Sequence, residues 1–134
     1  MALEYRRETQ RKNDKLISNL LENLPTEVAA FVRANEVTKS DNTLLSYVRD
    51  ISQFLTYVKE NTFLLNDMEV SNVNLHFWTT LDTSQIKEYE RYLSKVNNLT
   101  NTSIKRRLSS LATFYKHLNA FHGIEHNPLR DYAY

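Results

Sequence analysis

Apolar residues recur at every third or fourth position along several stretches of the chain, a spacing that predicts amphipathic α-helices. The clearest pattern lies in residues 42–60, another begins after residue 82, and a third lies in residues 102–121. The apolar positions are Leu44, Tyr47, Val48, Ile51, Leu55 and Val58; Ile86, Tyr89, Leu93 and Val96; and Ile104, Leu108, Leu111, Phe114, Tyr115 and Leu118. Each set covers one side of its helix, so we expect the three helices to share a core.

Capping residues and a proline mark the ends of the expected helices. A charged helix over residues 3–23 is closed by Pro25, and a shorter helix follows over residues 26–36. The expected N-caps are Thr26; Asp41 or Asn42; Asp82, in a capping box with Gln85; and Thr100, Asn101 or Thr102. Residues 61–81 have mixed periodicity, and we expect mostly loop with one short helical turn. Phe77 and Trp78 are expected to cover the core, with an aromatic platform for stacking bases as the alternative.

The single glycine and the two prolines among 134 residues favour an all-α fold, because tight β-hairpins depend on glycine-containing turns. The scarcity of glycine also excludes glycine-rich phosphate-binding loops. The absence of cysteine excludes disulfides and thiol nucleophiles. No stretch has the ~20 apolar residues of a membrane helix, and the charged N-terminal stretch does not resemble a signal peptide. We therefore expect one cytoplasmic domain.

Positive charge gathers towards the end of the chain. Residues 97–123 carry four bases and no acid, whereas residues 60–95 carry six acids and three bases. The polar sides of the helices over 42–60 and 102–121 combine bases with hydroxyl and amide groups, a mixture that contacts phosphates. The candidate residues are Thr43, Ser46, Arg49, Gln53, Thr102, Lys105, Arg106, Arg107, Ser109, Thr113 and Lys116. We expect Lys105, Arg106 and Lys116 to be unpaired in the free domain. Arg107 borders the apolar arc, and a merely solvated helix face is the alternative.

Three segments taken together resemble a known family. They are NTLLSYVRDISQFLTYV (42–58), TSIKRRLSSLATFYKHL (102–118) and NPL (127–129). Their order and spacing are similar to those of the N-terminal core-binding domain of tyrosine recombinases, the SAM-like helical domain of phage integrases and Xer recombinases. The matching residues are Thr43, Tyr47, Asp50, Ile51, Phe54, Arg106, Leu108, Ser109, Leu111, Phe114, Tyr115, Asn127 and Pro128. Ala112 departs from the pattern, which often has an arginine there, so one phosphate contact is expected to be missing.

The resemblance implies a compact four-helix SAM-like bundle with an extra N-terminal helix. It divides the chain into an N-terminal extension (1–25), a core-binding domain (26–131) and the start of a linker (132–134). Such a domain binds duplex DNA at a recombination site, as one half of a clamp, beside other recombinase protomers. The isolated domain is expected to be a monomer. The family's catalytic residues lie beyond the Asn-Pro dipeptide, so this chain is expected not to be an enzyme.

The tyrosines and histidines suggest no chemistry of their own. Four tyrosines within the expected helices are assigned to the core or its edge: Tyr47, Tyr89, Tyr92 and Tyr115. His122 and His126 flank Gly123, which favours a turn over the helical pair of histidines that binds metal. We therefore expect neither a metal nor another cofactor. A helical protein-interaction or accessory module with a basic face is the alternative function.

Overall fold

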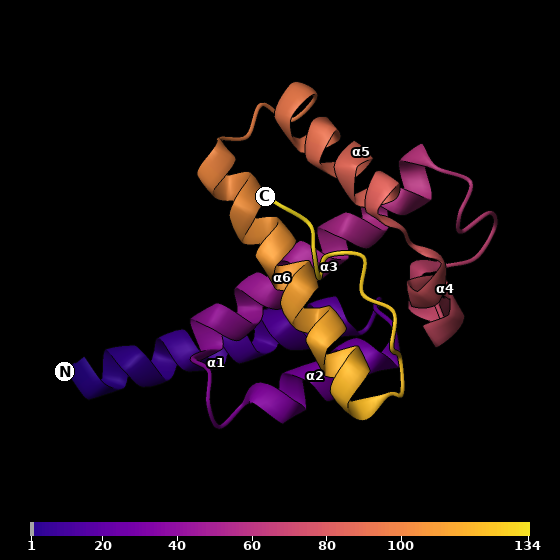
Figure 1. Ribbon diagram of the computed structural model, residues 1–134. Coiled ribbons are helices and arrows are strands. Elements are labelled where there is room, and N and C mark those ends of the chain that lie inside the picture. Colours follow the sequence, from indigo (N-terminus) through magenta and orange to yellow (C-terminus); the bar gives the residue numbers. More distant parts are fainter. Residues whose placement is uncertain (1) are drawn as a thin grey trace.

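The computed structural model describes residues 2–134, which form helices joined by loops, with no β-strand in that range (Figure 1). The α-helices are α1 (Ala2–Leu21), α2 (Thr26–Asn35), α3 (Asp41–Asn61), α4 (Leu75–Thr80), α5 (Thr83–Lys95) and α6 (Asn101–Phe121), and a 3₁₀ turn, η1 (Val70–Asn72), precedes α4. The all-α prediction is confirmed. No helix within residues 2–134 is long and apolar enough to cross a membrane.

The long helices lie where the apolar periodicity predicts them, except that α5 ends before Val96, which is 63% exposed and not part of the core. Two of the expected caps are wrong. Ser40, and not Asp41 or Asn42, caps α3 by accepting a hydrogen bond from the Thr43 amide at 3.2 Å. The side chains of Asp41 and Asn42 instead accept hydrogen bonds from Asn13 of α1, at 2.5 and 2.7 Å. A contact between helices has thus taken the groups that could have capped α3.

Of the other three expected caps, one is wrong and two are confirmed. Pro25 occupies the N-cap position of α2 without a side-chain hydrogen bond, so the expected cap at Thr26 is also wrong. The capping box of Asp82 and Gln85 is present at the start of α5. Thr100 caps α6 by accepting from the Ser103 amide. Within residues 2–134 the side chains of both confirmed caps form no hydrogen bond with another helix, so the local sequence alone determines which residue caps the helix.

The segment 61–81 is loop apart from the end of α3, the 3₁₀ turn η1 and one short helix. Asn74 caps this six-residue helix, α4, by accepting from the Phe77 amide, so the expectation of mostly loop with one short helical turn is confirmed. A helix this short presents too few positions to show a 3.6-residue period. Trp78 is 0% exposed and Phe77 is buried. Their assignment to the core is confirmed, and Trp78 is not available as a stacking platform.

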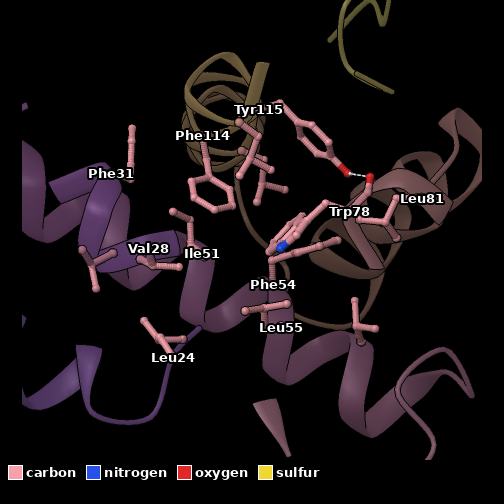
Figure 2. Close-up of a cluster of buried hydrophobic side chains, with 14 of the residues drawn as sticks. Leu24, Val28, Phe31, Ile51, Phe54, Leu55, Trp78, Leu81, Phe114 and Tyr115 are labelled. Atoms are coloured by element: carbon pink, nitrogen blue, oxygen red, sulfur yellow. Dashed lines mark hydrogen bonds between the residues drawn. The ribbon is translucent and has the colours of Figure 1, made fainter. Parts of the chain in front are cut away.

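Aromatic side chains from four helices form the centre of the core (Figure 2). Trp78 lies edge-to-face against Phe114, with ring centroids 4.9 Å apart, and Phe114 meets Phe31 in the same way at 5.4 Å. The Tyr115 hydroxyl donates a 2.6 Å hydrogen bond to the Trp78 carbonyl, drawn as the dashed line in Figure 2. Edge-to-face geometry suits the charge distribution of aromatic rings. These contacts join α2, α4 and α6.

Helix α6 is central to the arrangement, since it packs against α2, α3 and α5. All six apolar positions predicted for it are buried. Helix α1 packs its second half against α3, with Ile17 buried. Its first half extends away from the other helices (Figure 1). The bundle of α2, α3, α5 and α6, with α1 added at the N-terminus, matches the predicted architecture.

Candidate nucleic-acid interface

A shallow groove runs between the first half of α3 and the middle of α6. Its lining residues are Asn42, Thr43, Ser46 and Tyr47 from α3 and Arg106, Ser109, Ser110 and Thr113 from α6. The two helices lie side by side here because Leu44, Val48 and Ile51 on one and Leu108, Leu111 and Phe114 on the other enter the same core. The groove therefore brings together several of the predicted phosphate-contacting residues, with hydroxyl groups around one guanidinium.

Arg106 is held at the side of this groove by an acid from the neighbouring helix. Its Nη1 atom donates to Oδ2 of Asp50 at 2.6 Å. The Ser110 hydroxyl donates to the same oxygen, also at 2.6 Å. Asp50 is 2% exposed, whereas the Arg106 side chain is 51% exposed. The guanidinium thus compensates a buried carboxylate while part of it remains open to the groove.

The expectation that Arg106 is unpaired is therefore wrong. Its partner lies 56 positions earlier in the sequence, so the absence of acids around residue 106 carried no information about it. No local pattern in the sequence indicated that Ser110 or Asp50 would take part in this contact. The family pattern contained the available signal, since Asp50 and Arg106 are both among its matching positions.

The remaining predicted bases lie outside this groove. Arg49, Lys105 and Lys116 are exposed. Within residues 2–134 the ion pairs are those of Arg106 with Asp50 and of Lys87 with Glu90. Lys105 and Lys116 are accordingly unpaired, as predicted. Thr102 is exposed in the first turn of α6.

Arg107 occupies a different environment from its two basic neighbours. It lines a separate crevice together with Gln53, Tyr89 and Tyr92. Its Nε atom is buried and has no hydrogen-bond partner. Burial raises the pKa of the neighbouring Tyr89 hydroxyl to about 12, although the charge of Arg107 opposes that shift. The structure therefore does not bring Gln53 and Arg107 together with the groove residues.

The four tyrosines assigned to the core or its edge, Tyr47, Tyr89, Tyr92 and Tyr115, lie there as predicted. Tyr89 and Tyr115 are each 1% exposed. Burial raises the pKa of both hydroxyls, which disfavours the phenolate that a nucleophilic tyrosine requires. Near the end of the chain, the Tyr132 hydroxyl donates to a Glu90 carboxylate oxygen. The Tyr134 hydroxyl lies 3.4 Å from Oγ of Ser109.

The histidines near the end of α6 make contacts within the fold. Nε2 of His117 lies 3.0 Å from Nε2 of His122, and His126 contacts the Leu81 carbonyl. Within residues 2–134 no group of three or more His, Cys, Asp or Glu side chains is placed to hold a metal ion. The turn predicted at Gly123 is present, with a left-handed φ of 70°.

Residues 28–120 match the family described as the phage integrase N-terminal SAM-like domain. The chain belongs to this family. It is 35% identical over 91 residues to a tyrosine recombinase of Pseudothermotoga lettingae, a match that covers 67% of this chain and 27% of that protein. It is 28% identical over 105 residues to tyrosine recombinase XerC of Lacticaseibacillus casei, covering 75% of this chain and 30% of the relative.

The chain thus spans about a third or less of the length of these curated relatives. No solved structure matches it significantly. The family assignment agrees with the all-helical architecture, and the match contains the segments 42–58 and 102–118, whereas the NPL segment (127–129) lies beyond it.

Proposed function

We propose that this chain binds duplex DNA with sequence preference, as the core-binding part of a tyrosine site-specific recombinase. The observation that carries the proposal is the groove between α3 and α6, where Thr43, Ser46, Ser109 and Thr113 surround the guanidinium of Arg106. Family membership supports a role in recombination. In this role the DNA partner would be a recombination site, shared with other recombinase protomers.

Arg106 is the candidate for reading a base. Its ion pair with Asp50 uses Nη1, and the guanidinium has five N–H donors in a fixed planar fork. A pre-oriented fork loses little conformational freedom when it binds, and arginine pairs with the O6 and N7 acceptors of guanine in the major groove. The hydroxyls of Thr43 and Ser46 would bind phosphates beside it, which fixes the register of the protein on the duplex.

The chemistry of strand exchange is not expected from this chain. Tyr89 and Tyr115, the most buried tyrosines, are held in the core with raised pKa values. We propose that residues 26–131 form the DNA-binding unit and that residues 132–134 begin a connection to a catalytic unit. The chain should therefore bind a duplex without nicking it or forming a covalent tyrosine adduct.

Selection of bound duplexes from a randomised library tests the proposal, followed by titration of the selected and scrambled duplexes at two salt concentrations. We expect an enriched sequence, and an affinity that falls with log salt with a slope of about −0.9 per phosphate neutralised. Arg106→Lys keeps the charge but removes the fork. It should relax the preference at one base pair while the salt slope stays unchanged.

Arg33→Lys on α2 is the matched control, because Arg33 is also exposed and lies outside this groove. It should behave like the wild type. Binding without any enriched sequence would contradict sequence preference. Negligible duplex affinity at low salt would contradict the proposal altogether and favour a protein-interaction module.

A further inference from the structure

A second basic surface lies on the other side of α6, in a cleft between α5 and the first turns of α6. Lys87, Arg91 and Lys95 line it from α5, and Lys105 lines it from α6. All four bases are exposed. The three bases of α5 are spaced four residues apart, so they form one stripe along the helix. The stripe escaped the sequence analysis because acids outnumber bases over residues 60–95.

Two acids line this cleft, and one of them, Glu90, is engaged by other groups. Glu90 accepts a hydrogen bond from the Tyr132 hydroxyl and lies 3.8 Å from Nζ of Lys87. Arg91, Lys95 and Lys105 have no acidic partner within ion-pair distance among residues 2–134. Glu88 also lines the cleft. The unpaired positive charge is therefore concentrated on three side chains that face one channel.

The cleft and the proposed DNA groove flank the same stretch of α6. Asn101, Ile104 and Lys105 border the cleft, whereas Arg106 and Ser109 border the groove. The C-terminal segment lies between the two, since Tyr134 lines the cleft and its hydroxyl approaches Ser109. A DNA strand whose sugar-phosphate backbone passes from the groove across the start of α6 would next reach the basic side chains of α5.

We propose that Arg91, Lys95 and Lys105 bind the sugar-phosphate backbone of the same duplex, extending the interface from the α3–α6 groove across α6 to α5. Arg91 and Lys95 are ~6 Å apart along the helix axis at 1.5 Å per residue. That distance matches the axial rise of about two phosphates along one strand. These side chains contribute affinity without sequence preference. The inference rests on the proposed function.

The test compares the double variant Arg91→Gln/Lys95→Gln with the wild-type chain, by titration of the selected and scrambled duplexes at several salt concentrations. Each lost phosphate contact lowers the salt slope by about 0.9, so the double variant should lose about 2 from the slope. It should weaken binding to both duplexes by the same factor and retain the wild-type sequence preference. Melting curves should not change, because both side chains are exposed.

The matched control is Arg33→Gln/Lys39→Gln, which removes two exposed bases at and beyond the end of α2. It should keep the wild-type slope. Equal slopes for the wild type and for Arg91→Gln/Lys95→Gln would overturn the inference while leaving the α3–α6 groove intact as an interface. A slope lowered equally by both double variants would also overturn it, since it would show a general effect of net charge. Absence of duplex binding by the wild type would instead refute the proposed function.

Discussion

Arg106 serves the fold and the proposed interface with the same guanidinium. A carboxylate as buried as that of Asp50 is costly unless it is paired and hydrogen-bonded, and here Arg106 and Ser110 supply both. The ion pair also orients the arginine towards the groove. A substitution at this position therefore changes stability and binding together, which distinguishes it from substitutions of its neighbours.

Replacing Arg106 by alanine should destabilise the domain by about 1–3 kcal/mol, because Asp50 would keep only its hydrogen bond from Ser110. The loss should stay below the 3–5 kcal/mol of a fully buried pair, since the arginine side chain is half exposed. Lys105→Ala, an exposed and unpaired neighbour, should stay within about 0.5 kcal/mol of the wild type. Urea denaturation measures both. Equal stability of the two variants would show that the ion pair does not stabilise the fold.

The buried imidazole of His117 should make stability depend on pH. Burial among aromatic rings lowers its pKa from 6.5, and the adjacent His122 lowers it further. The unfolded chain therefore binds this proton at a higher pH than the folded chain does. Its contribution to stability is complete above about pH 6.5 and is lost as the pH falls from there through the lowered pKa.

Urea denaturation between pH 5 and pH 7.5 should show the wild type gaining stability as the pH rises. His117→Gln should flatten this dependence, because the titrating group is gone. His76→Gln removes an exposed histidine and should retain the wild-type dependence. A wild-type pH profile in His117→Gln would assign the effect to other groups.

At the residue scale, the sequence predicted which side chains are buried better than it predicted which ones pair. Burial follows from periodicity, so the apolar arc of α6 was predicted completely. Pairing of Arg106 with Asp50 depends on two helices meeting at one point, and no local pattern encodes that meeting. Arg107 shows the same limit, since its crevice is built from α3 and α5 as well as α6.

At the scale of elements, α4 depends on its neighbours more than any other helix. Six residues are too few for a stable isolated helix. It is held by the buried ring of Trp78 and by the hydrogen bond from Tyr115 to the Trp78 carbonyl. This dependence explains why residues 61–81 gave no clear helical pattern, whereas α3 and α6, with 21 residues each, did.

Tyr115→Phe tests the attachment of α4. It removes one hydroxyl and leaves the buried Trp78 carbonyl without that donor, which should cost about 1–3 kcal/mol of unfolding free energy. Tyr5→Phe alters a phenol that is 73% exposed and should stay within about 0.5 kcal/mol of the wild type. Hydrogen exchange should show faster opening of α4 in Tyr115→Phe. Unchanged exchange and stability would mean that ring packing alone holds this helix.

At the scale of the whole molecule, the second half of α1 packs against the bundle and its first half is exposed to solvent. Residues 2–12 are exposed apart from the half-buried Thr9, and burial begins at Asn13 and Ile17. Asn13 joins α1 to the start of α3 through its two hydrogen bonds. The proposed boundary after residue 25 lies close to residue 28, where the match to the family begins. The packed core extends further back, into the second half of α1.

Shortening the chain from its N-terminus should distinguish how much each of these two parts of α1 contributes to stability. Removing residues 1–11 should leave the unfolding free energy within about 0.5 kcal/mol of the wild type, because residues 2–11 are exposed apart from the half-buried Thr9. Ile17→Ala in the full chain should cost about 2–5 kcal/mol, because it empties a buried site between α1 and the bundle. Urea denaturation measures both. A large loss on removing residues 1–11, or none for Ile17→Ala, would mean that α1 is anchored elsewhere than at its second half.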